Sequence, residues 1–262
     1  MSGVVDDAPD LERRFGGLRR LYGDAGYARI RAARFAIVGV GGVGSWCAEA
    51  LARSGVAGLT LIDLDHVSES NINRQIQATS ATIGQAKVQA LRERIAAIHP
   101  GCEVTCVEDF VDADNWPALL PQPVDGVVDA CDQVRAKAVI AAWALATRSM
   151  LVIAGAAGGK RQPHAVQVED LGLVTHDPLL AALRQRLRKQ HGAARGGKIG
   201  VRCVFSREAV VAPDEVCEVG SDADGTNDSS LNCHGYGSSV GVTATFGMVA
   251  ASLALESAAA QK

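Results

Sequence analysis

A glycine-rich turn between an apolar run and a helical segment constrains the fold of this chain more than any other feature. The six residues from Gly39 to Gly44 read GVGGVG, after the apolar run 34–38 and before the helical segment 45–53. Glycine lets a backbone turn tightly and approach phosphates that a Cβ would keep away, and the helix start offers unpaired amides to the anion. Asp63 ends a second apolar run about 20 residues on, where an acid can bind a ribose hydroxyl. The pattern predicts a nucleotide site at Gly39, Gly41, Gly42, Gly44 and Asp63.

The segments around this turn alternate between strand-like and helix-like patterns. The predicted strands are 34–38, 58–65, 103–111, 124–130 and 150–154, and the predicted helices are 45–53, 85–99 and 135–147. Strands that alternate with helices imply right-handed crossovers and a mostly parallel sheet with helices on both faces. We therefore expect an α/β fold of the Rossmann-like type.

The chain is expected to divide into a tail, a nucleotide-binding domain and a C-terminal extension. Residues 1–12 are small, acidic and irregular, which is typical of a disordered tail. Residues 13–159 carry the Rossmann-like pattern. Residues 160–262 are expected to bind substrate and to pack on the same globular unit. Their predicted elements are strands at 165–171 and 201–208, a helix from Asp177, a mobile acidic segment at 218–230 and an apolar helix at 240–255.

Composition excludes several classes of protein. The seven cysteines are an odd number and include no Cys-x-x-Cys pair, which argues against a disulfide framework and a structural zinc site and fits a reducing cytoplasm. A net charge of −3 means that bulk charge does not recruit nucleic acid, so any basic surface must be local. The apolar helix at 240–255 is at most about as long as the shortest membrane span and lacks basic flanks, so we expect a packed helix and no membrane partner.

Charged residues after Asp63 favour ATP over a dinucleotide. A triphosphate carries about twice the charge of a pyrophosphate bridge, and its departing pyrophosphate needs neutralising in the transition state. Arg74 and Lys87 can supply that positive charge, and Asp132 stands just beyond the fourth predicted strand, where an acid can hold magnesium. Taken singly, Lys87 could instead be a solvated helix residue, and Asp132 could cap the next helix.

These motifs resemble a known family. VGVGGVGS, LIDLDHVSESNINRQ, IGQAK and VVDACD together look like the ubiquitin-activating-type adenylyltransferases of the ThiF/MoeB/HesA superfamily, over residues 31–159. The resemblance implies an adenylation domain at 13–159 that forms an acyl-adenylate and pyrophosphate from ATP and a carboxylate. It implies ribose binding by Asp63 and catalytic roles for Arg74 and Lys87 on the phosphates and Asp132 on magnesium. The further residues expected at the nucleotide are Asp65, Asn71 and Gln75.

Over nearly its full length the chain is similar to the tRNA threonylcarbamoyladenosine dehydratases (TcdA or CsdL type). The similarity rests on RFGGLRRLYG, AGAAGGKRQPHAVQVEDL, HDPLLAALRQRLRK, GVRCVFSREA and GVTATFGMVA. It implies ATP-dependent closure of threonylcarbamoyladenosine in tRNA to a cyclic hydantoin, with net loss of water. It also implies a homodimer in the cytoplasm, and it raises a monovalent cation and a cysteine-desulfurase partner as candidates.

Three other functions remain open on the sequence. The first is an adenylyltransferase for a ubiquitin-like sulfur carrier, although such enzymes usually carry the zinc-binding cysteine pairs absent here and an arginine where this chain has Gly17. The second is an NAD-dependent oxidoreductase, which would leave Lys87 and the NINRQ segment unexplained. The third is a non-catalytic sulfur-trafficking adaptor. Cys233 could capture the acyl group as a thioester, but ring closure is intramolecular and requires no thiol, so we do not expect it to be catalytic.

A local basic segment supports contact with RNA. No acidic residue occurs from Pro178 to Arg207, and basic residues cluster there on a chain of negative net charge. The alternative is a solvated amphipathic helix whose leucines pack inward. The residues expected to contact RNA are Arg184, Arg186, Arg188, Lys189, Arg195, Lys198 and Arg202.

Overall fold

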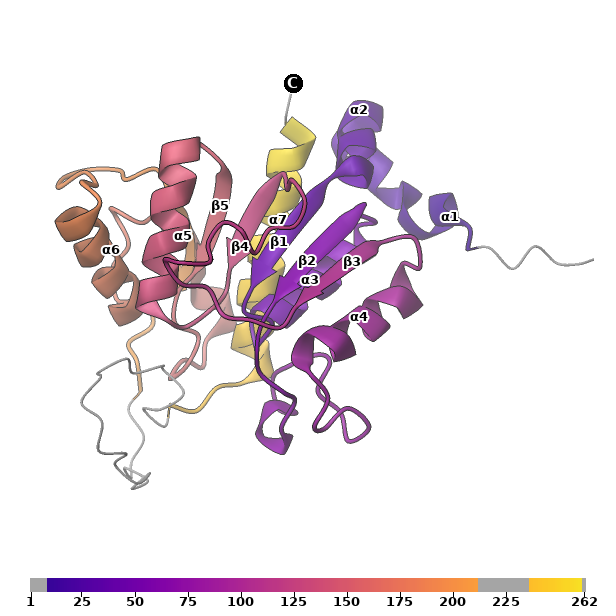
Figure 1. Ribbon diagram of the computed structural model, residues 1–262, viewed down its shortest axis with the longest axis horizontal. Coiled ribbons are helices and arrows are strands. Elements are labelled where there is room, and N and C mark those ends of the chain that lie inside the picture. Colours follow the sequence, from indigo (N-terminus) through magenta and orange to yellow (C-terminus); the bar gives the residue numbers. More distant parts are fainter. Residues whose placement is uncertain (1–8, 212–235, 261–262) are drawn as a thin grey trace, which may run out of the picture.

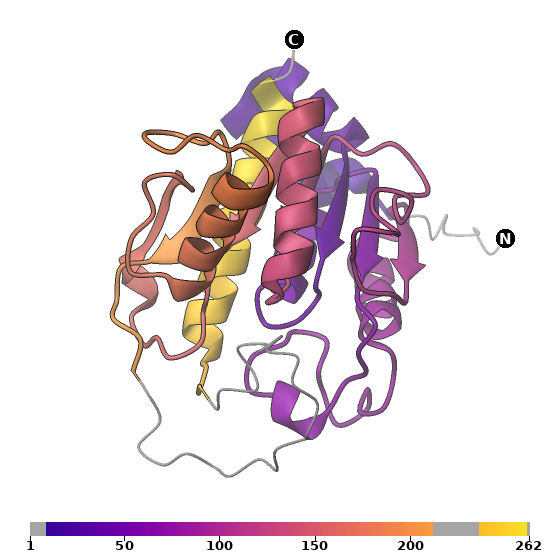
Figure 2. The ribbon, with the colours of Figure 1, turned by 60° about the vertical axis from the view of Figure 1, so that its left-hand side comes forward.

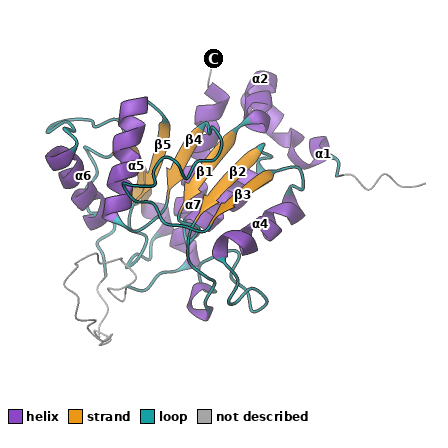
Figure 3. Cartoon of the chain, viewed as in Figure 1, coloured by secondary structure: helices purple, strands orange, loops and turns teal. Residues whose placement is uncertain are grey.

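One seven-stranded sheet organises the molecule. The computed structural model describes residues 9–211 and 236–260, and its strands run in the order β3-β2-β1-β4-β5-β7-β6 (Figures 1 and 3). All neighbouring strands are parallel except β6 and β7, which pair antiparallel. The strands are β1 (Arg34–Val38), β2 (Gly58–Ile62), β3 (Glu103–Val107), β4 (Gly126–Asp129), β5 (Met150–Ala154), β6 (Val166–Asp170) and β7 (Arg202–Ser206).

Helices cover both faces of the sheet. The helices are α1 (Leu11–Phe15), α2 (Arg19–Ala32), α3 (Gly44–Arg53), α4 (Lys87–Ile98), α5 (Val134–Thr147), α6 (Pro178–Gln190) and α7 (Val240–Ala260). Strand side chains alternate between two cores. In β1, Phe35 and Ile37 join the core under α3, α4 and α7, whereas Ala36 and Val38 join the core under α5 and α6. The expected α/β fold with a mostly parallel sheet and helices on both faces is confirmed.

The second strand ends earlier than expected, and the reason is chemical. The prediction ran to residue 65, but β2 stops at Ile62. Beyond it the carboxylate of Asp63 accepts hydrogen bonds from the backbone amides of Val40 (2.7 Å) and Asp65 (2.9 Å). Asp63 therefore directs the chain away from the sheet and toward the glycine loop.

The N-terminal segment is helical where the sequence predicted none. The disordered tail was expected to reach residue 12, yet Leu11 and Glu12 begin α1, and the side chain of Asp10 caps that helix through the amide of Arg13 (3.0 Å). Four glycines between residues 16 and 26 argue against a helix by propensity. Packing outweighs that propensity, because Phe15 is buried and Gly23 takes the one non-helical conformation (φ 69°) inside α2.

The C-terminal extension completes the sheet. Strands β7 and β6 follow β5 at one edge, so the boundary predicted after residue 159 lies within one continuous sheet. Helix α7 is long and apolar enough to cross a membrane by length and composition alone, and 44% of the qualifying window is buried. It packs against α3, α2 and β5, and its first turn lies near the glycine loop because Thr243 contacts Gly42. The predicted mobile segment 218–230 lies outside the described residues.

Candidate active site

The candidate site lies where the strand order reverses. The chain runs from β1 outward to β2 and β3, then returns to β4 on the other side of β1, so the loops after β1 and β4 diverge. In open α/β sheets ligands bind at such a point, outside the carboxyl ends of the strands. A cavity of about 430 Å³ occupies this place.

The glycine loop needs glycine at two positions for different reasons. Gly39 adopts φ 81°, and a Cβ there would lie 2.8 Å from the backbone nitrogen of Cys131 in the neighbouring loop. Gly44 does not line the cavity, because it packs against the carbonyl of Gly39 and lets α3 begin close to the loop. Gly39, Gly41 and Gly42 line the cavity, and Gly44 shapes the loop that they form.

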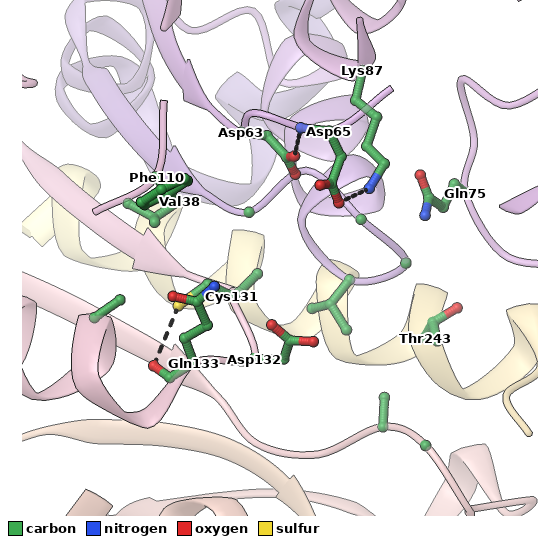
Figure 4. Close-up of a pocket in the computed structure, with 18 of the residues that line it drawn as sticks. Val38, Asp63, Asp65, Gln75, Lys87, Phe110, Cys131, Asp132, Gln133 and Thr243 are labelled. Carbon is green, nitrogen blue, oxygen red and sulfur yellow. Dashed lines mark hydrogen bonds and ion pairs between the residues drawn. The ribbon is translucent and has the colours of Figure 1, made fainter. Parts of the chain in front are cut away.

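Asp63 and Asp65 follow β2 at one wall of the cavity. Two backbone amides fix the Asp63 carboxylate, and burial raises its pKa, opposed by the nearby Lys87. Asp65 is exposed and forms an ion pair of 2.6 Å with the Nζ of Lys87 (Figure 4). These two acids and this lysine therefore form one polar wall.

Lys87 is not the solvated helix residue that the sequence left open. It is the first residue of α4, its side chain is only 8% exposed, and it lines the cavity. Its backbone amide also binds the carbonyl of Asp65 (3.0 Å), which ties the start of α4 to the acid loop. The cation is thus held at the cavity by both its backbone and its side chain.

Asp132 does not cap the following helix. The N-cap of α5 is Gln133, which makes no side-chain capping bond. Asp132 is half-buried and lines the cavity below Asp65 and Lys87 in Figure 4. Burial raises the pKa of its carboxyl, with the backbone and nearby cations acting in the opposite sense. A carboxylate in this position can share a metal ion with phosphates.

Arg74 and Gln75 line the cavity, whereas Asn71 does not. The Arg74 backbone carbonyl accepts a hydrogen bond of 2.9 Å from the indole of Trp46 on α3, and burial lowers the pKa of its half-buried guanidinium. The Asn71 side chain instead accepts the amide of Ser68 (3.0 Å) and closes a capping box. The Asn71 side chain thus shapes the loop that carries Arg74, and its contact with the nucleotide stays a prediction.

Comparison with known proteins agrees with this geometry. The ThiF family model matches residues 14–260, which is almost all of the chain. The chain belongs to the ThiF family. Two relatives, both tRNA threonylcarbamoyladenosine dehydratases, are similar over nearly their whole lengths. The Escherichia coli protein is 45% identical over 98% of this chain and 96% of its own, and the Haemophilus influenzae protein is 38% identical over 97% and 96%.

Solved structures show the same likeness in three dimensions. The Escherichia coli dehydratase, solved in complex with ATP, superposes on this ThiF-family chain with a TM-score of 0.84 at 43% identity, and covers 95% of this chain and 96% of its own. A second structure of that protein, with AMP, also gives 0.84. The expected resemblance to the tRNA threonylcarbamoyladenosine dehydratases is therefore confirmed.

Several residues that line the cavity of this ThiF-family chain belong to none of the motifs in its sequence. Phe110, which follows β3, is 52% exposed and lies beside Val38 at one side of the cavity (Figure 4). The loop 155–158 after β5 and the residues Tyr236, Ser238 and Thr243 before and in α7 complete the lining. The glycines of the loop 155–158 could have indicated that loop from the sequence. The position of α7 against α3 depends on tertiary packing, so no local pattern predicts the residues that α7 contributes.

A buried ion pair supports the loop that carries Asp132. Lys137 and Asp129 are fully buried, and Nζ of Lys137 lies 3.1 Å from the Asp129 carboxylate and 3.0 Å from the carbonyl of Ala154. The same carboxylate accepts the amide of Cys131 (3.2 Å). Burial raises the pKa of the Cys131 thiol well above its usual value, so this cysteine is a weak nucleophile although it lines the cavity. Cys233 lies outside the described residues.

The predicted RNA-binding residues do not gather at the cavity. Arg184 donates to the carbonyls of Leu171 and Val174 (3.1 and 2.7 Å), and Arg188 donates to that of Ala194 (2.9 Å). The loop that follows α6 lies toward the end of α7, away from the first turn of α7 that lines the cavity (Figures 1 and 2). Exposed cations are found in that direction at Lys189, Arg195, Lys198 and Arg202.

Proposed function

We propose that this chain is an ATP-dependent tRNA threonylcarbamoyladenosine dehydratase. The observation that carries the proposal is the match along essentially the whole length of both chains to dehydratases from two bacteria, combined with a cavity that brings Arg74, Lys87 and Asp132 together at the switch point of the sheet. Its substrates are ATP and a tRNA that carries threonylcarbamoyladenosine, and its place of action is the cytoplasm.

The reaction has two steps. One oxygen of the threonyl carboxylate attacks the α-phosphorus of ATP, and pyrophosphate leaves. A nitrogen of the carbamoyl group then attacks the acyl carbon and loses its proton, and AMP leaves with the former carboxylate oxygen. The net change in the nucleoside is loss of water. The second step is intramolecular, so no covalent enzyme intermediate is needed to make it fast.

Each part of the cavity has a role in the first step. Phe110 and Val38 offer an apolar wall for the adenine of ATP, and the fixed carboxylate of Asp63 accepts its ribose hydroxyl. Gly39, Gly41 and Gly42 let the phosphates approach the backbone. Arg74 and Lys87 stabilise the charge that develops on the departing pyrophosphate.

Magnesium fits this site as a partner of ATP and not as a resident metal. Among residues 9–211 and 236–260 no group of three metal-ligating side chains exists. Magnesium is commonly held by one or two carboxylates together with substrate phosphates, and the half-buried Asp132 supplies one such carboxylate. The ion would neutralise phosphate charge beside Asp132. A monovalent cation near the phosphates, a homodimer and a cysteine-desulfurase partner belong to the same proposal through the family resemblance.

A second candidate is an adenylyltransferase for a ubiquitin-like sulfur carrier. The Escherichia coli molybdopterin-synthase adenylyltransferase is 37% identical, but over only 48% of this chain and 51% of its own. A match over half of each chain supports adenylation without supporting the substrate of this relative. The full-length relatives favour tRNA.

Nucleoside mass spectrometry tests the proposal. Threonylcarbamoyl-modified tRNA is incubated with the protein, magnesium and ATP, then digested to nucleosides. The expected result is loss of about 18 mass units from the modified nucleoside, because ring closure removes one water, and only when ATP is present. An unchanged mass with intact ATP binding would contradict the proposal and favour the sulfur-carrier alternative.

A further inference from the structure

The cavity has two ends of different chemistry. Every charged side chain among its described lining residues precedes position 133, and these are Asp63, Asp65, Arg74, Lys87, Asp109 and Asp132. Among the described residues, the lining beyond residue 133 is uncharged, and it includes Leu179, Tyr236 and the loop 155–158. A triphosphate and its metal ion need the charged end. The uncharged end is therefore left for another chemical group.

The two aromatic residues among the described lining residues lie on opposite flanks of the switch point. Phe110 follows β3, whereas Tyr236 packs on Gly158 and Gly159, which follow β5. Four strand spacings separate β3 from β5, which is roughly 19 Å at about 4.8 Å per spacing. Phe110 thus lies on the side of the charged end, and Tyr236 lies at the uncharged end.

The glycines beside Tyr236 let its ring pack closely against the loop after β5. A Cβ on Gly159, which adopts φ 71°, would lie 3.3 Å from Cδ1 of the Tyr236 ring, and a Cβ on Gly158 would lie 3.4 Å from its Cβ. The amide of Gly159 also donates to the carbonyl of Gly237 (2.8 Å). On the other side, the amide of the Asn73 side chain donates to the carbonyl of Ser238 (2.9 Å), so the segment 236–238 is fastened at both sides of the cavity.

We infer that Tyr236 is the stacking platform for the modified adenine of the tRNA, which is extruded from the anticodon loop into the uncharged end. The inference rests on the proposed function and names the residue that would recognise its second substrate. Enzymes that act on a base commonly take it out of the stack, and extruded bases stack on aromatic side chains. A base held at this end directs its threonylcarbamoyl arm toward the charged end, where the α-phosphate of ATP would lie.

Hydrogen bonding in the loop 155–159 favours a stacked base over an extended peptide tail. A peptide tail binds mainly through main-chain groups. The amides of Gly155, Ala156 and Gly159 already donate to the carbonyl of Val204 (2.8 Å), to the carboxylate of Asp177 (2.9 Å) and to the carbonyl of Gly237 (2.8 Å). Few amides remain to pair with a tail, whereas a flat ring needs only the face of Tyr236 and apolar contact with Leu179.

A double-mutant cycle between protein and RNA tests the platform. Wild type, Tyr236→Leu and Tyr236→Phe are titrated with a labelled anticodon stem-loop that carries either the modified adenosine or an abasic site in its place. Loss of one base–aromatic stack weakens binding by about 5- to 150-fold, so the wild type and Tyr236→Phe should lose affinity in that range on the abasic RNA. Tyr236→Leu should bind the modified RNA that much more weakly and lose little further affinity on the abasic RNA. Equal losses in the wild type and Tyr236→Leu would overturn the inference.

Steady-state kinetics supply the matched comparison. Tyr236→Leu should raise the KM for modified tRNA and leave the KM for ATP unchanged, and Phe110→Leu, at the other end, should do the reverse. A rise in the KM for ATP alone in Tyr236→Leu would also overturn the inference, and ATP binding by each variant shows that it has folded. A wild-type protein that leaves the modified tRNA unchanged defeats the proposed function together with the inference. A wild type that converts it while the cycle shows no coupling defeats the platform alone.

Discussion

At the scale of single residues, the site depends on side chains whose positions other groups determine. Asp63 is fixed by two amides, Lys87 by an ion pair with Asp65, and Arg74 by the indole of Trp46 that binds its carbonyl. Asp132 is half-buried and lines the same cavity, and we propose that it holds the magnesium ion of ATP. Its variants are therefore the most informative.

Asp132→Asn should abolish adenylation without unfolding the protein. The amide keeps the shape of the side chain but removes the charge that would hold magnesium, so we expect kcat to fall by at least about 100-fold, as for loss of one electrostatic contact in a transition state. The measurement is tRNA-dependent release of pyrophosphate. Asp114→Asn is the matched control, since Asp114 is exposed and outside the cavity. Wild-type rates in Asp132→Asn would refute the metal role.

The same variant should be more stable than the wild type at neutral pH. Burial raises the folded pKa of Asp132 above its ordinary value of 3.8, so the folded state binds the proton more tightly than the unfolded state. Stability from this group therefore falls as pH rises from the unfolded to the folded pKa, and the whole cost is present above both. We expect the Tm of Asp132→Asn to exceed that of the wild type at pH 7, and the difference to shrink on acidification. A lower Tm at pH 7 would contradict this account of the burial.

At the scale of elements, the sequence predicted what is local and missed what is tertiary. The turn, the acid Asp63 and the alternating apolar runs predicted the position of the cavity and most of the strands, because glycine geometry and residue periodicity are local properties of the sequence. No sequence pattern revealed that the side chain of Asn71 closes a capping box and does not line the cavity. Phe110 and Tyr236 were missed because their position depends on which strands become neighbours.

Helix α7 offers a test of that tertiary part. Gly247 lies so close to α3 that a Cβ would fall 2.9 Å from both the nitrogen of Cys47 and the Cβ of Trp46. Gly247→Ala should push α7 away and cost about 1–3 kcal/mol of unfolding free energy, as overpacking does. It should also weaken ATP binding, since Trp46 and Thr243 hold the loop of Arg74. Urea denaturation and ATP titration measure the two effects.

Gly241→Ala is the control on the same helix. A Cβ at Gly241 would have its nearest neighbour at 4.0 Å, on Pro163, so the residue can be enlarged without a clash. The substitution should be neutral or stabilise by about 0.4–1 kcal/mol, because alanine restricts the unfolded chain. Equal changes of unfolding free energy in Gly247→Ala and Gly241→Ala would contradict the role of the contact with α3, because alanine is the better helix former at both positions.

At the scale of the whole molecule, the cavity lies far from the basic loop, which is the segment 191–201 between α6 and β7. Helix α6 begins near the cavity, which its residue Leu179 lines, and its length of about 20 Å carries the chain away before the basic loop begins. Cations near the end of a helix also complement its dipole, which is an adequate reason for Arg188 and Lys189 without any RNA. A tRNA that reaches the cavity is large enough to touch the distant loop as well.

RNA contact is best tested at basic side chains that make no hydrogen bond or ion pair with another described residue. Arg184 and Arg188 donate to backbone carbonyls, so changing them would disturb the fold as well as any RNA site. Arg195 and Lys198 are exposed in the loop after α6, and neither makes a hydrogen bond or ion pair with another described residue. The double change of Arg195 and Lys198 to Glu should therefore weaken tRNA binding and spare ATP binding.

The salt dependence of binding decides whether these two residues contact phosphates. Each phosphate contact releases counterions, so the slope of log K against log salt should become less steep by about 1 for each lost contact, or about 2 for the double variant. Arg13→Glu with Arg92→Glu makes the same charge change at exposed positions on α1 and α4 and is the matched control. Because both double variants lower the net charge equally, a similar loss in each would assign the effect to long-range attraction. A smaller slope confined to the Arg195 and Lys198 variant would place the tRNA backbone on this loop, so the substrate would span the molecule from the cavity to the far end of α6.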